Sequence, residues 1–293
     1  MKASAFSYAR ATSISNALEL LVAYGDRAKV LSGGQSLMPA MNLRLISPEF
    51  IVDIGELTEL RGIGVAKNIL KIGALTRHVD LQKSAEVATH APLLAEAVAE
   101  IAHPAIRNRG TIGGSLAHAD PASELPACML ALNATIIVSG PKGERRVAAG
   151  DFFKGIYETV LSPEELLIEI ELPIARKNSA YFFQEFARRR GDYAITGLAA
   201  QAVVDGGRFT DLRMAFFAIA DRPVLAKAAT ALVGVSITPA VLAAALAALD
   251  DELHPHEEQQ ASASMRRHLA RLLMARGVAA LLGRPDLDFG GHA

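Results

Sequence analysis

The sequence predicts a chain of the α+β class that is built from three folding units. At 293 residues it is longer than one average domain. Short apolar runs typical of strands occur in all three parts of the chain, between amphipathic segments with helical spacing. The hydrophobic fraction of 51% and the charged fraction of 21% indicate a globular protein with a substantial core, not a disordered or coiled-coil chain.

The first unit, residues 1–57, has the pattern of a small α/β fold. Apolar residues recur at helical spacing over Ser15–Tyr24, which follows a cap at Ser13 or Ser15, so we expect a helix there. Two short strands and a glycine-bearing turn between them are expected at Lys29–Leu31, Phe50–Ile54 and Ser32–Ser36.

The second unit, residues 58–176, combines strands and helices. Pro92 begins the clearest helix, Pro92–Ile101, because its missing N–H costs least in a first turn. Two further helices are expected over Leu125–Leu132 and from Val79–Lys83 onward. Strands are expected at Ile69–Ala74, Ala134–Ser139, Arg145–Val147 and Leu166–Leu172. The segment Arg107–Gly114 is expected to be a loop.

The third unit, residues 177–285, begins with strands and ends with alanine-rich helices. The strands are expected at Tyr181–Ala187, Gly197–Val204 and Arg213–Ile219, with turns at Asp205–Gly207 and Asp221–Pro223. The helices are expected at Pro239–Leu249 and Ser264–Leu282. The tail Pro285–Ala293 is expected to be frayed.

Composition argues against several classes of function. The formal net charge of -1 gives no reason to expect binding to nucleic acid or to an anionic membrane. No apolar run approaches the ~20 residues that a membrane span needs, and the N-terminus lacks a signal-peptide pattern, so we expect a cytoplasmic protein. The single cysteine, Cys128, permits neither an intrachain disulfide nor a cysteine-ligated iron–sulfur cluster, and we interpret it as a buried structural thiol. The histidines show no metal-ligand spacing, and we expect His254 and His256 to be solvated and no metal to be bound.

Two glycine-bearing segments, Ser32–Leu37 and Thr111–Ser115, concentrate the chemistry of the chain. Glycines tolerate positive φ and carry no Cβ, so such a loop can turn successive N–H groups toward an anion. Taken alone, one Gly-Gly pair is better explained by a tight turn. Two pairs suit a pyrophosphate held from two sides, although neither segment matches GxGxxG or the P-loop.

Three longer segments resemble a known family. They are LSGGQSLMPAMNLR at Leu31–Arg44, IRNRGTIGGSLAHADPASELP at Ile106–Pro126 and FARRRGDYAI at Phe186–Ile195. They are similar to segments of the FAD-binding medium subunits of molybdenum hydroxylases, which include carbon monoxide, nicotine and heterocycle dehydrogenases, and of the FAD domain of xanthine dehydrogenase. The resemblance spans essentially the whole chain. It implies two α/β subdomains of the p-cresol methylhydroxylase type that clasp FAD, and a C-terminal α+β domain of the carbon monoxide dehydrogenase flavoprotein type.

The resemblance also implies which residues hold FAD. It assigns the pyrophosphate to the two glycine segments, the sugar or ribityl hydroxyls to Glu124, and one flavin face to Tyr193. His118 and Asp120 would shape the second segment. The full set is Lys29, Leu31, Ser32, Gly33, Gly34, Gln35, Ser36, Leu37, Ile101, Ala102, Ile106, Thr111, Gly113, Gly114, Ser115, Ala117, Glu124, Leu167 and Tyr193. Core packing explains Ile101, Ala102 and Leu167 equally well, and Lys29 is equally well explained as a surface lysine.

The same resemblance implies an oxidoreductase subunit with no catalytic acid or base of its own. A large molybdopterin subunit would oxidise the substrate, and a small subunit would pass electrons from two [2Fe–2S] clusters to FAD and on to an external acceptor. The assembly implied is a heterotrimer or its dimer, for which the alanine-rich helices and Arg188–Arg190 are candidate contact surfaces. The alternatives are a stand-alone flavin-dependent oxidoreductase and a non-redox scaffold. We do not expect a covalent flavin, for which His78, His103 and His118 would be the attachment sites.

Two departures from the family pattern bear on the substrate. Gln35 stands where carbon monoxide dehydrogenase has histidine, and Ser115 stands where it has aspartate. Both residues are more similar to those of nicotine, ketone or heterocycle dehydrogenases, which weakens carbon monoxide as the substrate. The cysteine-bearing insertion of the benzoyl-CoA reductase branch is also missing, in agreement with Cys128 standing alone.

Overall fold

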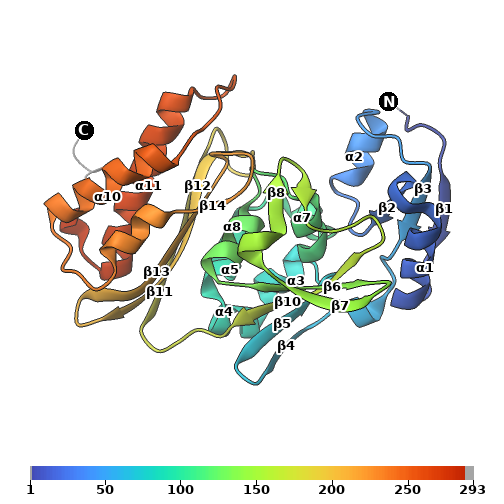
Figure 1. Cartoon of the computed structure of the whole chain (residues 1–293), viewed down its shortest axis with the longest axis horizontal. Helices are drawn as coiled ribbons and strands as arrows, with labels where there is room; N and C mark the ends of the chain where they lie inside the picture. Colours follow the sequence, from blue (N-terminus) through green and yellow to red (C-terminus); the bar gives the residue numbers. More distant parts are fainter. Residues whose placement is uncertain (1, 288–293) are drawn as a thin grey trace.

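The computed structural model describes residues 2–287, which form three main sheets arranged along the molecule (Figure 1). The N-terminal unit lies at one end, the C-terminal sheet and its helices lie at the other, and the middle unit joins them. Helices and strands are mixed throughout, as the α+β class requires. No helix within residues 2–287 is long and apolar enough to cross a membrane.

The N-terminal unit is a parallel sheet of order β1-β3-β2 that is covered by helix α1. Its elements are β1 (Ser7–Arg10), α1 (Ile14–Tyr24), β2 (Ala28–Leu31), α2 (Leu37–Asn42) and β3 (Phe50–Asp53). The predicted helix and both predicted strands are confirmed, and Ser13 caps α1 by accepting a hydrogen bond from the Asn16 N–H at 3.0 Å. Strand β1 was not predicted, because its sequence SYAR lacks an apolar alternation and its side chains are mostly exposed.

The middle unit is an antiparallel five-stranded sheet of order β4-β5-β10-β6-β7. Its strands are β4 (Ile63–Ala66), β5 (Ile69–Gly73), β6 (Thr135–Gly140), β7 (Gly143–Ala148) and β10 (Leu166–Pro173), and a small hairpin adds β8 (Phe153–Gly155) and β9 (Glu158–Thr159). Its helices are α3 (His78–Lys83), α4 (Ala85–His90), α5 (Pro92–Glu100), α6 (Pro104–Arg107), α7 (Ile112–His118), α8 (Glu124–Ala131) and α9 (Ala149–Phe152).

The predicted loop over Arg107–Gly114 is wrong at both ends. Helix α6 ends at Arg107, and helix α7 begins at Ile112, so Gly113 and Gly114 lie in its first turn. Thr111 starts this helix by accepting a hydrogen bond from the Gly114 N–H at 3.1 Å. Glycine is a poor helix former, but a Cβ on Gly113 would lie 2.7 Å from Ala74 Cβ, so close packing requires glycine here.

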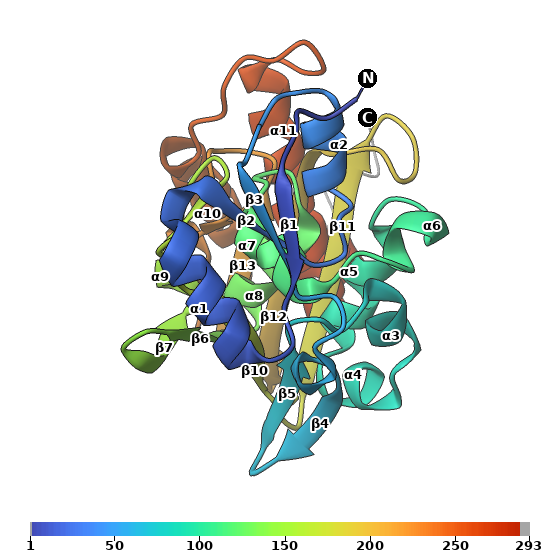
Figure 2. The same ribbon diagram turned by 90° about the vertical axis from the view of Figure 1, so that its right-hand side faces the viewer.

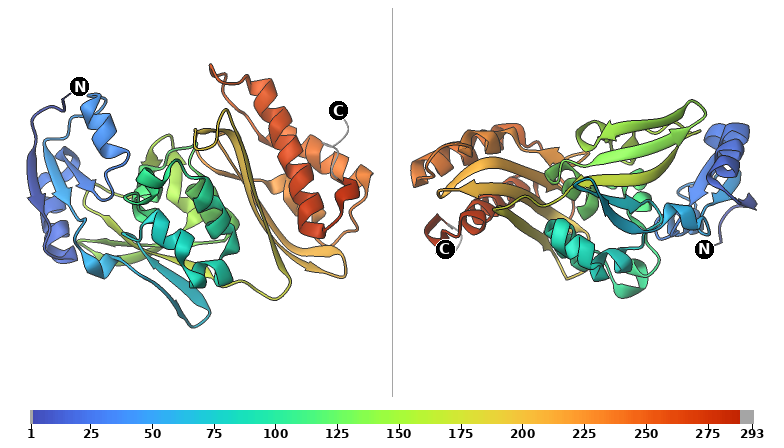
Figure 3. Two further views of the ribbon diagram at one scale, coloured as in Figure 1. Left: turned by 180° about the vertical axis from the view of Figure 1, so that it is seen from behind. Right: turned by 90° about the horizontal axis from the view of Figure 1, so that it is seen from below.

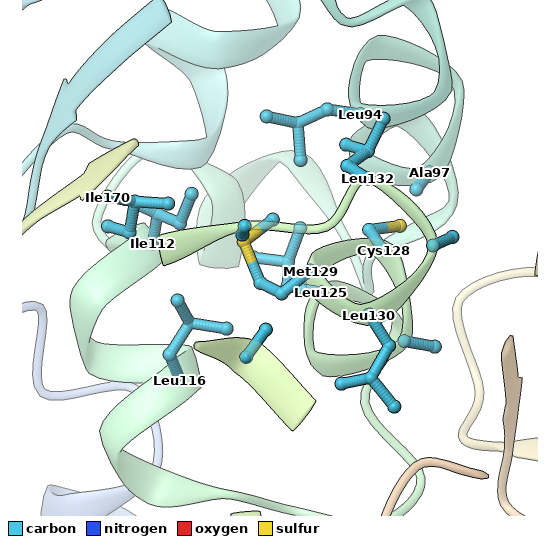
Figure 4. Packing of buried hydrophobic residues seen from close by; sticks show 14 of the residues in the cluster. Leu94, Ala97, Ile112, Leu116, Leu125, Cys128, Met129, Leu130, Leu132 and Ile170 are labelled. Atoms are coloured by element: carbon cyan, nitrogen blue, oxygen red, sulfur yellow. The ribbon is translucent and has the colours of Figure 1, made fainter. Parts of the chain in front are cut away.

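Helices α7 and α8 pack against each other in the middle core (Figure 4). Ile112 and Leu116 of α7 and Met129 of α8 are fully buried there. Cys128 is also fully buried, which confirms its interpretation as a buried thiol. The core therefore fixes the start of α7, and with it the second glycine segment.

The C-terminal sheet, of order β11-β12-β13-β14, is covered by helices on both faces (Figure 3). Its elements are β11 (Ser179–Ala187), β12 (Ala194–Asp205), β13 (Arg208–Phe217), β14 (Val224–Leu225), α10 (Pro239–Glu252) and α11 (Ala263–Leu282). In β11, Phe182 faces the α10 and α11 side, while Tyr181 and Phe183 face the core that contains α5 and α8. The third unit thus shares a core with the second.

The predicted frayed tail is wrong for its first three residues. Pro285–Leu287 form a short 3-10 helix, and Leu287 is fully buried in the C-terminal core. The rest of that tail, 288–293, lies outside the described residues. His254 and His256 are exposed, as expected.

Candidate functional site

The two glycine segments meet in space although they lie far apart in the sequence. Ser32 follows β2 and Thr111 precedes α7, and their hydroxyl oxygens Oγ and Oγ1 are 2.7 Å apart. In Figure 2, which faces the N-terminal unit, α7 appears behind the sheet that carries β2. The N-terminal and middle units therefore meet at the residues that the sequence singled out.

Glycines make this close approach possible. A Cβ on Gly33 would lie 2.2 Å from the backbone oxygen of Arg109, which no real side chain could tolerate. A Cβ on Gly114 would lie 2.8 Å from Thr111 Oγ1. The glycines thus let the backbones of the two segments pack directly against each other and against neighbouring residues.

The first segment exposes a row of unused backbone donors. Among the described residues, no acceptor lies within hydrogen-bond distance of the N–H groups of residues 33–36. Gly34 has a φ of 71°, the left-handed conformation that lets consecutive N–H groups converge. The Gln35 side chain stays within the turn, because its Nε2 donates to the Gly33 carbonyl at 2.9 Å. These features are those expected of an anion-binding nest.

The second segment differs from the expectation of a second nest. Its Gly113 N–H donates to the Ala74 carbonyl at 2.9 Å, and its Gly114 N–H donates to Thr111 Oγ1. These two donors are already engaged. Thr111 is buried and its Oγ1 is paired with Ser32 Oγ, so the segment offers a ligand the hydroxyl of Ser115, which is partly exposed.

Carboxyl groups gather beside α8. Glu124 is partly buried at its first turn, and burial, with Glu185, Asp120 and Glu100 nearby, raises its pKa to about 8. No other side chain within residues 2–287 forms a hydrogen bond with the Glu124 carboxyl group. A ligand with hydroxyl groups would supply the missing hydrogen bonds.

Glu185 faces this same space from the C-terminal sheet. It follows Tyr181 and Phe183 at a two-residue spacing in β11, so it points toward α5 and α8. Burial, followed by the charge of Glu100, raises the pKa of Glu185 to about 7. Its Oε2 is buried without a hydrogen-bond partner among the described residues.

The connection from β11 to β12 lies against the turn after α5. A Cβ on Gly191 would lie 2.8 Å from the Ala102 carbonyl oxygen, so the two backbones touch. Arg107 Nη1 holds this turn by donating to the Ile101 and Ala102 carbonyls at 2.8 and 3.2 Å. Tyr193, on the same connection, is 66% exposed, and partial desolvation by its surroundings, followed by the charges of Asp120 and Glu124, raises its pKa.

Two of the three arginines at Arg188–Arg190 form ion pairs. Arg190 Nη2 lies 3.2 Å from Glu100 Oε1, and Arg189 Nε lies 3.6 Å from Asp192 Oδ2. These pairs are largely exposed, so each contributes little to stability. The Arg190 pair nevertheless links this connection to α5.

The predicted site residues separate into three groups. The glycine segments, with Leu31, Leu37 and Ile106 beside them, form the first, and Ile101, Ala102, Glu124 and Tyr193 form the second. The third group consists of Lys29 and Ala117, which are exposed, and Leu167, which is buried in the middle core.

Several polar or aromatic residues at the site were missed. Arg107 lies within the second motif, and its role could have been suspected from that position. The Tyr157 ring lies against that of His118, with the ring centroids 4.9 Å apart and the planes tilted by 30°, and Tyr157 adopts a left-handed φ of 56°, which its sequence neighbours do not signal. Glu185 is brought to the site only by the pairing of β11, so no local pattern could have revealed it.

Two protein families match adjacent parts of the chain, and together they cover most of its length. The family described as the FAD binding domain in molybdopterin dehydrogenase matches residues 4–175, and the family described as the CO dehydrogenase flavoprotein C-terminal domain matches residues 181–281. The chain is 38% identical to 6-hydroxypseudooxynicotine dehydrogenase complex subunit alpha of Paenarthrobacter nicotinovorans, and the match covers 97% of each protein.

Two further comparisons concern Hydrogenophaga pseudoflava. The chain is 35% identical to the carbon monoxide dehydrogenase medium chain of that organism, over 95% of this chain and 98% of the relative. It superposes on a solved structure of carbon monoxide dehydrogenase from the same organism with a TM-score of 0.95 at 36% identity, covering 97% of this chain and 99% of the other.

Proposed function

Since the chain belongs to the family of FAD-binding medium subunits of the molybdenum hydroxylases, we propose that it carries electrons from the [2Fe–2S] clusters of a partner subunit, through FAD, to an external acceptor. It is the flavoprotein component of an oxidoreductase. Bound FAD would supply the redox chemistry, and the chain would bind and orient it. The substrate would be oxidised on a separate molybdenum subunit.

The meeting of the two glycine segments is the observation that carries this proposal. The free N–H groups of residues 33–36 suit the pyrophosphate of FAD, because phosphate oxygens only accept hydrogen bonds. No side chain within residues 2–287 forms a hydrogen bond with the Glu124 carboxyl group, so cofactor hydroxyls could donate to it. We propose that residues 1–57 and 58–176 clasp FAD between them, and that residues 177–285 bring Tyr193 and Glu185 to its flavin end.

A subunit role is favoured over a stand-alone enzyme. The chain matches its relatives over nearly their full length, and their names describe a complex subunit and a medium chain. A stand-alone oxidoreductase would need a substrate site in addition to the FAD site within the same length. A scaffold without FAD would have no need for the steric fit of Gly33 or for the nest of residues 33–36.

An exposed apolar surface beside the first glycine segment suits a partner subunit. It consists of Phe6, Leu43, Leu45 and Ile46, and Leu45 is 74% exposed. The N-terminal segment lies along the loop after α2, because Ser4 Oγ and Ser47 Oγ are 3.1 Å apart and Arg44 Nε donates to the Lys2 carbonyl at 3.2 Å. Exposed apolar surfaces of this kind are typical of protein interfaces. We call it the Leu45 patch.

The test is to purify the chain alone and with the subunits encoded beside it, and to record flavin content and reduction. We expect about one non-covalent FAD per chain, released by acid. We expect the organic substrate to bleach the flavin absorbance only when the molybdenum and iron–sulfur subunits are present. Bleaching of the isolated chain by the substrate would favour the stand-alone enzyme, and a colourless complex would favour the scaffold.

A further inference from the structure

His78 is a buried residue behind the second glycine segment, and the proposed function leaves its chemistry unused. The residue is only 3% exposed. Its backbone N–H donates to the Gly110 carbonyl at 2.9 Å. A Cβ on Gly110 would lie 2.9 Å from the ring atom Cε1, so the imidazole fills the space beside that glycine. The ring is therefore fixed in place.

Among residues 2–287, Ser115 is the only residue that meets the geometry of a hydrogen bond with the ring, and the Thr111 backbone lies nearby without meeting it. His78 Nε2 lies 3.1 Å from Ser115 Oγ, whereas Nδ1 is buried without a partner among residues 2–287. Burial is the main reason that the pKa of His78 is lowered to about 4; Arg107 lowers it further, and the nearby Thr111 carbonyl opposes the shift. The ring is accordingly neutral near pH 7 and carries a single N–H.

The position of that hydrogen determines what Ser115 can do. A buried N–H without an acceptor is a rare and costly feature, and an unpaired acceptor is less so. The hydrogen therefore belongs on Nε2, where Ser115 Oγ accepts it. A serine hydroxyl that accepts a hydrogen bond from histidine keeps its own hydrogen for another partner.

We propose that His78 is a positioning residue of the cofactor site: its Nε2–H donates to Ser115 Oγ and thereby leaves the Ser115 hydroxyl hydrogen to donate to the FAD pyrophosphate. The inference rests on the proposed FAD site and deepens it. In the other tautomer, Ser115 would donate to the ring and could not donate to a phosphate at the same time. The position of the hydrogen on the His78 ring thus determines whether the Ser115 hydroxyl accepts a hydrogen bond from His78 or donates one to it.

The first test measures FAD affinity of the full chain by fluorescence titration. His78→Leu removes the donor with a side chain of similar volume, and His78→Gln retains an N–H donor. We expect His78→Leu to weaken FAD binding about fivefold, as the loss of one oriented hydrogen bond would. We expect His78→Gln to recover most of that affinity.

A background of Ser115→Ala separates positioning from a general structural role. If His78 acts through Ser115, His78→Leu causes no further loss of FAD affinity in the Ser115→Ala chain. An equal loss in both backgrounds, or no rescue by His78→Gln, would overturn the proposal. A wild-type chain that binds no FAD would overturn both this inference and the proposed function, so the two failures are distinguishable.

The second test needs no cofactor and therefore remains informative if His78→Leu does not fold. A ¹⁵N NMR spectrum of the wild-type chain with labelled histidine shows which ring nitrogen carries hydrogen. We expect the hydrogen of His78 on Nε2 at pH 7. A hydrogen on Nδ1 would contradict the inference whatever the FAD affinity.

Discussion

Ser32 Oγ and Thr111 Oγ1 lie 2.7 Å apart and join the N-terminal unit to the middle unit at the proposed cofactor site. Thr111 serves a second purpose, because its Oγ1 also accepts the Gly114 N–H at 3.1 Å and so caps α7. One hydroxyl pair thereby connects the start of a helix to a loop 79 residues away. Binding of FAD and docking of the two units should be coupled through it.

A double-mutant cycle on this pair measures that coupling. We expect Ser32→Ala and Thr111→Ala to lower the free energy of unfolding in urea, with an interaction energy of about 1 kcal/mol between them. Thr111→Ala should cost about 1 kcal/mol more than Ser32→Ala, because it also removes the cap of α7. Strictly additive effects would show that the hydroxyls do not interact in solution.

Gly33→Ala tests the steric fit of the first glycine segment. The added Cβ would lie 2.2 Å from the Arg109 backbone oxygen, and backbone cannot move aside as a flexible side chain can. We expect a loss of stability of about 1–3 kcal/mol and at least a tenfold loss of FAD affinity. Thermal unfolding and fluorescence titration measure the two effects separately.

Gly64→Ala is the matched control for that variant. Gly64 lies in β4 with an ordinary φ, and no atom lies within 4 Å of a Cβ built on it. We expect its stability and its FAD affinity to stay at the wild-type values. If Gly33→Ala behaves like Gly64→Ala, the close approach of residue 33 to Arg109 is not required for the site.

The carboxyl cluster predicts that the cofactor-free chain loses stability as pH rises. Glu124 has a pKa of about 8 in the folded chain, against an ordinary value of 4.5 when unfolded. Between these values the unfolded chain has already released a proton that the folded chain still holds, so alkaline conditions favour unfolding. We expect the urea midpoint to fall progressively between about pH 4.5 and pH 8, with Glu185 contributing in the lower part of that range.

Glu124→Gln isolates this effect, because glutamine is close to a protonated glutamate in shape and does not titrate. The decline in stability with pH should be shallower in this variant, and the remainder should come largely from Glu185. An unchanged decline would show that water reaches Glu124 freely in the folded chain. Glu124 is partly exposed, and an unchanged decline would agree with that exposure and disagree with a pKa as high as about 8.

The sequence alone located the parts of the site that depend on local patterns. Both glycine segments were identified by composition, and α5 was predicted from the placement of Pro92 and its apolar spacing. The start of α7 was missed, because two glycines oppose a helix and only the packing of Gly113 on Ala74 reveals why they are needed. Local propensity was overridden by tertiary contact.

Residues contributed by distant elements could not be predicted. Glu185 reaches the carboxyl cluster because β11 pairs with β12 and presents one face to α5 and α8. His78 was considered only as an attachment site, since its burial and its contact with Ser115 follow from the tertiary fold. No pattern within either segment distinguishes these residues from a surface glutamate or histidine.

The Leu45 patch predicts where an iron–sulfur partner would dock. Helix α2 spans six residues between Ser36 and Leu43, so the patch begins about 9 Å from the nest along the axis of that helix.

Leu45→Glu places a charge in the patch without touching the cofactor segments, so we expect normal FAD content but weaker co-purification with the small subunit. Val22→Glu on α1, where Val22 is 49% exposed, is the control and should leave assembly intact. If Leu45→Glu assembles as well as the wild type and its flavin is reduced at the same rate, the partner docks elsewhere, and the Arg188–Arg190 connection becomes the next surface to test.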